Sequence, residues 1–186
     1  MSKSKHQTAP DPNEKGWPKG VPFIIGNEGC ERYSYYGMRA ILYLYVVYLY
    51  QTVGGNGEGF ANNEATKVVH DFGAAVYALP MIGALVADRL LGKYHTILWL
   101  SGVYSLGHLV LSLTEGTFMG LYFGLGLIAI GSGGIKPCVS AHVGDQFGKG
   151  NWNLLQKIYQ IFYFIINFGS FFATILTPWT RVHFGW

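Results

Sequence analysis

The sequence contains 186 residues, of which 50% are hydrophobic and 12% are charged. Soluble domains carry about 25% charged residues, so the composition argues against an ordinary soluble protein. The net charge of +3 is too small and too dispersed to indicate a nucleic-acid-binding surface. Aromatic residues reach 16% and there are 26 glycines, which is typical of helical membrane proteins, where aromatics anchor at the headgroups and glycines allow close helix packing.

Residues 1–22 are polar, include four lysines and lack an apolar segment. This pattern predicts a flexible cytoplasmic tail and argues against a cleavable signal. A membrane span needs about 20 largely apolar residues, and we find five such segments within residues 23–186. We expect the spans at about 23–50, 65–87, 96–113, 118–143 and 158–177.

Basic residues occur in alternate connections. Besides the tail, they lie in the second-to-third and fourth-to-fifth connections, as Arg89, Lys93, Lys149 and Lys157. The first-to-second and third-to-fourth connections contain no Lys or Arg, and Lys67, near the outer end of the second span, is the one mild exception. Because positive charge gathers on the cytoplasmic side, we expect the N-terminus inside and Trp186 outside.

The first span contains charged residues at its N-terminal end, within NEGCERYSYYGMRAIL. A charge at the bilayer centre costs about 2.5–3.5 kcal/mol on insertion scales. Helical spacing places the polar residues on one face, which must line a protein interior or a water-filled cavity. The alternative for Glu28 is snorkelling to the nearby interface. This polar stripe consists of Glu28, Glu31, Arg32, Tyr35, Tyr36 and Arg39.

The second span contains two further candidates and leads into a charged loop. His70 and Tyr77 are seven residues apart and therefore share a helical face. A lone histidine is more often a packing residue than a switch, so both interpretations of His70 stay open. In the following GALVADRLLGKYHTI, Gly83 permits close helix approach, and Asp88 and Arg89 can pair with the ends of neighbouring helices.

The fourth and fifth spans each contain a costly polar residue. GSGGIKPCVSAHVGDQF places Lys136 beside Pro137, which frees a backbone carbonyl, and among glycines that allow another helix to come close. FYFIINFGS offers Asn167 for an amide contact, the alternative being a hydrogen bond between helices. Cys30 and Cys138 are too far apart in sequence to indicate a disulfide framework or a metal site.

These motifs resemble those of one protein family and occur in the same order as in that family. EGCERYSYYGMRAIL resembles the ExxER and YYGMRAIL signature of the proton-dependent oligopeptide transporters, a branch of the major facilitator superfamily. GALVADRLLGKYHTI resembles the superfamily's loop motif, and the fourth and fifth segments resemble GxGGIKPCVSAxxGDQF and FYxxINxGS. The resemblance implies an all-α membrane protein, with five transmembrane helices of an incomplete six-helix N-terminal bundle.

The resemblance also implies roles for the candidate residues. Proton coupling is expected of Glu28, Glu31, Arg32 and His70. Peptide binding is expected of Tyr35, Tyr36, Arg39, Tyr77, Lys136 and Asn167. A conformational latch is expected of Gly83, Asp88, Arg89, Gly92 and Lys93.

The expected function is proton-coupled symport of di- and tripeptides by alternating access, in a multi-pass protein of the inner or plasma membrane. A transporter of this type has twelve core spans in two bundles, so we expect the C-terminal half as a partner and no transport by this chain alone. The alternatives are transport of nitrate or another small organic anion, and a vestigial membrane protein without transport. No enzymatic motif, cofactor or metal is expected, and the proton gradient would supply the energy.

Overall fold

The structure, a computed structural model, describes residues 9–185; residues 1–8 of the predicted tail and Trp186 lie outside the described part. The described residues are helical and contain no strand. A π-helical turn, Ala87–Leu91, and a short 3-10 turn, Trp152–Leu154, lie beside the long helices. The long helices are α1 (Val21–Thr52), α2 (Glu58–Val86), α3 (Gly92–Leu113), α4 (Phe118–Gly144) and α5 (Leu155–Phe184).

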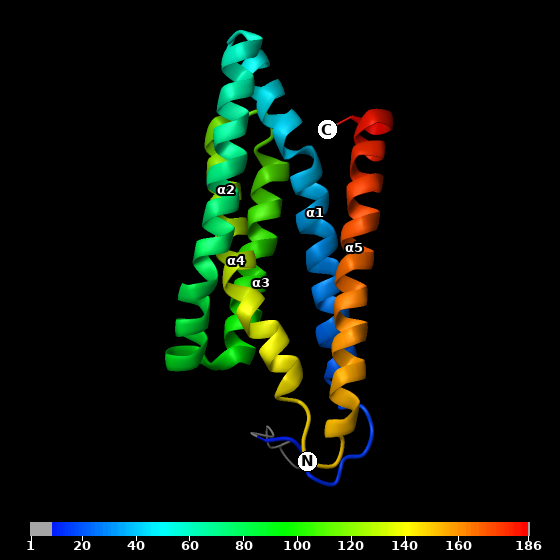
Figure 1. Ribbon diagram of the computed structural model, residues 1–186. Coiled ribbons are helices and arrows are strands. Elements are labelled where there is room, and N and C mark those ends of the chain that lie inside the picture. Colours follow the sequence, from blue (N-terminus) through cyan, green and yellow to red (C-terminus); the bar gives the residue numbers. More distant parts are fainter. Residues whose placement is uncertain (1–8, 186) are drawn as a thin grey trace.

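Within the described residues, three helical stretches are long and apolar enough to cross a membrane: Glu58–Leu113, Phe118–Gly144 and Trp152–Phe184. The first stretch contains two helices, α2 and α3, since the chain turns back at Gly92, whose φ is 75° (Figure 1). Helix α1 does not qualify, since charged residues and tyrosines run along it and lower its hydropathy. An all-helical membrane protein is therefore confirmed, and the number of five spans stays a prediction.

The helices form two groups that meet at the polar side of α1. Helices α2 and α3 both pack on α4, while α1 packs on α5 and, further along, on α2 (Figure 1). Helix α4 is buried along much of its length because small residues let its neighbours come close. Where α2 meets α4, a Cβ added to Gly83 would lie 2.7 Å from the carbonyl oxygen of Gly134. The sequence-based expectation that Gly83 permits close approach is confirmed.

The connections alternate between the two ends of the bundle (Figure 1). The N-terminal segment and the α2–α3 and α4–α5 connections lie at one end, which therefore holds the basic residues of the alternate loops. The α1–α2 and α3–α4 connections and the end of α5 lie at the other. Lys67 and Arg181 are the basic residues of that second end.

Part of the segment that the sequence predicts as a tail packs on the protein. The Asn151 side chain, only 1% exposed, donates from Nδ2 to the carbonyl of Gly16 at 3.0 Å and accepts from the backbone N–H of Gly148 at 2.9 Å. A Cβ on Gly150 would collide with the carbonyl oxygens of residues 12 and 14. Residues 12–16 are therefore docked on the α4–α5 connection, and α1 begins at Val21.

Candidate functional site

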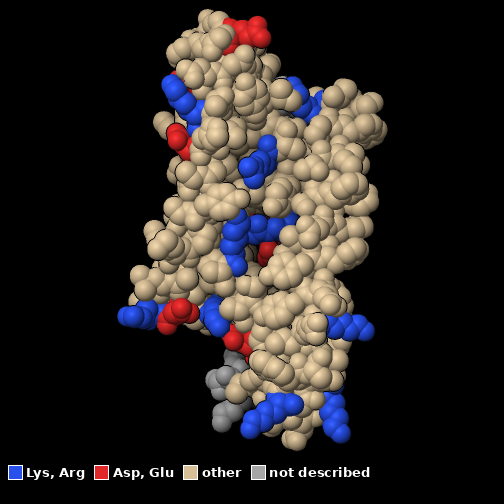
Figure 2. Space-filling model, viewed as in Figure 1, with Lys and Arg blue, Asp and Glu red and all other residues tan. Residues whose placement is uncertain are grey.

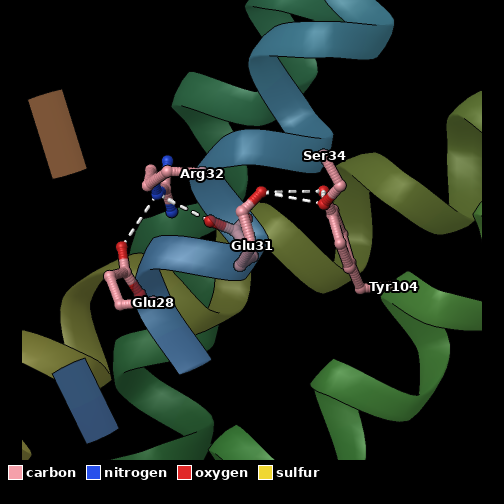
Figure 3. Close-up of polar contacts among 5 residues, drawn as sticks. All are labelled: Glu28, Glu31, Arg32, Ser34 and Tyr104. Atoms are coloured by element: carbon pink, nitrogen blue, oxygen red, sulfur yellow. Dashed lines mark hydrogen bonds and ion pairs between the residues drawn. The ribbon is translucent and has the colours of Figure 1, made fainter. Parts of the chain in front are cut away.

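The charged residues of α1 form a buried cluster. Glu28, Glu31 and Arg32 are only 5%, 7% and 5% exposed. The Arg32 Nε lies 2.8 Å from Glu28 Oε1, one helical turn away, and 2.6 Å from Glu31 Oε2 (Figure 3). The spacing of three and four residues brings all three side chains to one face. The burial of Glu28, Glu31 and Arg32 agrees with an interior face and argues against snorkelling of Glu28, whereas Arg39, at the far end of the stripe, is exposed.

The cluster is not fully satisfied by the protein. Within the described part of the chain, Glu28 Oε2, Glu31 Oε1 and Arg32 Nη2 are buried without a hydrogen-bond partner. An incompletely paired buried ion is costly. One guanidinium cannot neutralise two carboxylates, so the pair of carboxylates carries one excess negative charge that a proton can neutralise. The cluster therefore has the chemistry to accept a proton.

A cavity of about 210 Å³ lies against the cluster. It is bounded by α1, α4 and α5, and Figure 2 shows basic side chains around a hollow half-way along the molecule, with an acidic side chain inside it. The cavity brings residues from three motifs together. Its lining includes Glu28, Arg32, Tyr36, Lys136, Ser140 and Tyr163.

Lys136 brings a second cation to this cavity from α4. Its Nζ lies 5.2 Å from the ring centre of Tyr35 and 5.1 Å from that of Tyr77. Cation–π contacts of this kind stabilise an ammonium without neutralising it. Among the described residues, no carboxylate forms an ion pair with Lys136. The ammonium is thus held between two tyrosines with its charge available to an anion.

Three of the remaining candidates, Arg39, His70 and Asn167, do not line this cavity. Arg39 is exposed one helical turn beyond Tyr35, and His70 is exposed two turns before Tyr77 on α2. The Asn167 Nδ2 donates to the Tyr163 carbonyl of its own helix at 2.7 Å. The Asn167 amide nitrogen therefore bonds within α5 and not to another helix, which is the alternative expected from the sequence.

The charged loop after α2 makes one ion pair with a residue that the sequence did not single out. Asp88 and Arg89 are exposed in the π-helical turn. Lys93, at the start of α3, is 2.6 Å from Asp145, which follows α4. This ion pair links the α2–α3 turn to the residue that follows α4, as expected of a latch. Pairing of Asp88 and Arg89 with neighbouring helix ends stays a prediction.

Sequence reasoning also missed a hydroxyl pair beside Glu31. Ser34 Oγ and the Tyr104 hydroxyl of α3 are 2.6 Å apart, and both lie within hydrogen-bond distance of the main-chain carbonyl of Glu31 (Figure 3). Ser34 lies close to the polar stripe, so its position could have been noticed. Tyr104 gives no local signal, since it is one aromatic residue of an apolar helix.

The sequence pattern of the POT family matches residues 94–186, which is half of the chain. The chain belongs to this family, and the family is one of membrane transporters. The peptide transporter family 1 protein of Drosophila melanogaster is 49% identical over 172 residues, which are 89% of this chain and 22% of that protein. Human solute carrier family 15 member 1 is 44% identical over 184 residues, which are 90% of this chain and 25% of that protein.

Solved structures agree with these relatives. The POT family transporter PepTSo is 47% identical and superposes with a TM-score of 0.87, over 91% of this chain and 33% of that one. A proton-dependent oligopeptide (POT) family transporter is 48% identical, with a TM-score of 0.81, over 89% of this chain and 36% of that one. The chain spans about a quarter of the length of the curated relatives that it matches.

Proposed function

We propose that these helices bind a short peptide and a proton in a proton-coupled peptide symporter that works by alternating access. The observation that carries the proposal is the buried cluster of Glu28, Glu31 and Arg32 beside a cavity into which Lys136 brings an unneutralised ammonium. Peptide transporters among the relatives support the peptide as substrate.

Charge counting links the two ligands. With both carboxylates ionised, the cluster of Glu28, Glu31 and Arg32 carries one negative charge, and the nearby Lys136, which forms no ion pair with it, brings the four residues together to zero net charge. A proton on one carboxylate leaves one positive charge in a largely buried site. The carboxylate of a peptide restores neutrality, so proton and peptide favour each other's binding, and this coupling is reciprocal by linkage.

The uncharged parts of the site suit the rest of a peptide. Tyr35 and Tyr36 on α1, Tyr77 on α2 and Asn167 on α5 offer hydroxyl and amide groups to the peptide backbone. Asn167 keeps its carbonyl oxygen for this purpose, since only the amide nitrogen bonds to Tyr163. Aromatic walls bind varied side chains through apolar contact, which favours a broad substrate range.

We also propose that all five long helices cross the membrane, with the N-terminal end of the bundle in the cytoplasm. The support is that the N-terminal segment and the basic α2–α3 and α4–α5 connections lie at the same end. Burial of Glu28, Glu31 and Arg32 lowers the cost of placing α1 in the bilayer.

Cysteine labelling checks this orientation. In a Cys30→Ser background, we expect a membrane-impermeant maleimide added to sealed cells to label Glu58→Cys and to spare Lys15→Cys until the cells are opened. Both positions are exposed in the protein, and Cys138 is buried. Labelling of Lys15→Cys in sealed cells would reverse the proposed topology.

Replacing the cations of the site tests peptide binding. The system is a chimera in which this chain replaces the matching third of PepTSo, reconstituted in liposomes under an inward proton gradient. A desolvated cation bonded to a carboxylate contributes about 1.5–3 kcal/mol, so Lys136→Gln or Arg39→Gln should weaken dipeptide binding roughly ten- to a hundredfold. The loss should be much smaller for a dipeptide amide, which has no carboxylate.

The matched control is Lys157→Gln, an exposed lysine at the start of α5, which should leave both affinities unchanged. Equal losses for acid and amide would make Lys136 and Arg39 structural or gating charges. A chimera that is inhibited by nitrate but not by dipeptides would replace the peptide with a small anion as substrate.

A further inference from the structure

Three oxygen atoms meet at the point where α3 reaches α1 (Figure 3). The Ser34 hydroxyl donates to the Glu31 main-chain carbonyl at 2.9 Å, and the Tyr104 hydroxyl donates to the same oxygen at 3.1 Å. The two hydroxyl oxygens are 2.6 Å apart. The carbonyl belongs to the residue whose side chain pairs with Arg32, so the contact lies at the level of the charged cluster.

The three contacts share only two hydroxyl protons, one on Ser34 and one on Tyr104. Either both hydroxyls donate to the carbonyl, or one donates to the carbonyl and the other to its neighbour. Every arrangement leaves the Glu31 carbonyl bonded from the side, in addition to its place in the helix. Bonds of this kind fix a helix locally and bend it.

The position of Tyr104 is fixed by contacts within α3 and with α4. It is buried, its ring stands edge-on to His108 with centres 4.7 Å apart, and a Cβ on Gly131 of α4 would lie 2.6 Å from its own Cβ. Helix α3 otherwise packs mainly on α4, whereas α1 packs mainly on α5 and α2. The Tyr104 hydroxyl therefore connects α1 to the group of helices that carries Lys136.

We propose that Tyr104 and Ser34 are positioning residues that hold the Glu31 main-chain carbonyl and thereby aim the Glu31 carboxylate at Arg32. This inference rests on the proposed function, in which Glu31 and Arg32 bind the proton. The hydroxyls do not touch the carboxylate. They set the height and rotation of α1, and so the direction in which the side chains of its polar face point.

The carbonyl contact can be observed directly in the full chain. Glu31–Arg32 is the one Glu–Arg step in the sequence, so labelling Glu at the carbonyl ¹³C and Arg at ¹⁵N gives a single correlated NMR signal. In lipid nanodiscs, we expect Tyr104→Phe to move its ¹³C shift upfield, because the carbonyl loses a hydrogen bond. The control is Tyr94→Phe on the same helix, whose ring lies beside His95 and His142.

Ser34→Ala is the second variant, and it should move the same signal upfield while leaving the phenol of Tyr104 in place. It keeps the test open if Tyr104→Phe does not fold. Glu31 carbonyl shifts in both variants equal to that of Tyr94→Phe would overturn the proposal; if only one variant folds, its shift decides. This measurement requires no transport, so it stands or fails independently of the proposed function.

Transport in the PepTSo chimera tests the consequence for coupling. A hydrogen bond contributes about 1 kcal/mol net, so Tyr104→Phe should lower proton-driven dipeptide accumulation by about fivefold. Exchange of dipeptide across the membrane without a proton gradient should be retained, because the binding side chains stay in place. Equal loss of exchange and accumulation would assign Tyr104 a general structural role and contradict positioning of Glu31. A chimera without any dipeptide transport would contradict the proposed function, whatever the NMR result.

Discussion

Glu31→Gln should abolish proton-driven accumulation of dipeptide in the chimera and spare dipeptide exchange. The amide keeps the shape of the side chain and loses the group that can gain and release a proton. Exchange requires binding and reorientation only, whereas uphill uptake requires the proton to be bound on one side and released on the other. The measurement compares uptake under an inward proton gradient with counterflow of labelled dipeptide at equal pH.

The matched control is Glu115→Gln, an exposed carboxylate in the α3–α4 connection, which should leave both rates unchanged. Normal gradient-driven accumulation by Glu31→Gln would refute the coupling role of this carboxylate. Loss of exchange together with accumulation would show that Glu31 serves binding or folding.

Arg32→Met should cause the largest loss of stability, about 3–5 kcal/mol in the free energy of unfolding, because removing one partner of a buried ion pair leaves its counter-charge unpaired. Here the side chain that is lost pairs with two buried carboxylates, at 2.8 and 2.6 Å. Unfolding of the chain in mixed detergent micelles, followed by circular dichroism, measures the change.

Two further variants identify the cause. Lys67→Met removes an ion pair with Glu64 in which the lysine side chain is 57% exposed, and it should leave the unfolding midpoint unchanged. Adding Glu28→Gln and Glu31→Gln to Arg32→Met should restore most of the lost stability, since no buried carboxylate is then left without Arg32. Equal stability of Arg32→Met and the unmodified chain would mean that the cluster is solvated.

The apolar helices could be located from the sequence because hydropathy marks their apolar middles, but their ends could be predicted only in part. The expected span 118–143 differs from α4 by one residue at its end. Helix α2 begins at Glu58, seven residues before the expected span 65–87, because polar residues continue the helix beyond the apolar segment. Helix α5 likewise runs from Leu155 to Phe184, past the expected 158–177. Hydropathy locates apolar stretches, and it is insensitive to where the backbone hydrogen bonds stop.

The site residues that lie on one helix could be predicted from the sequence, and the contacts between distant residues could not. The polar stripe of α1 follows from helical spacing alone, and the burial of Glu28, Glu31 and Arg32 agrees with it. The Lys93–Asp145 ion pair and the bond from Tyr104 to Glu31 join residues 52 and 73 positions apart. No periodic pattern in one helix indicates such a contact, because it depends on how two helices are placed against each other.

The placement of the charged cluster has a consequence for synthesis. Arg32 and Phe162, which line the same cavity, are 130 residues apart in the chain. At about 5–20 residues per second, roughly 6 to 26 seconds pass between making the one and the other. For most of this interval α1 lacks α4, which ends at Gly144, and for all of it α1 lacks the completed α5. The Glu28–Arg32 pair spans one turn of α1 itself, so it can form as soon as the helix does, and it lowers the charge that the lone helix presents to lipid. Glu31 pairs with the same guanidinium on α1, so the burial of the cluster, and not its ion pairing, depends on the later helices.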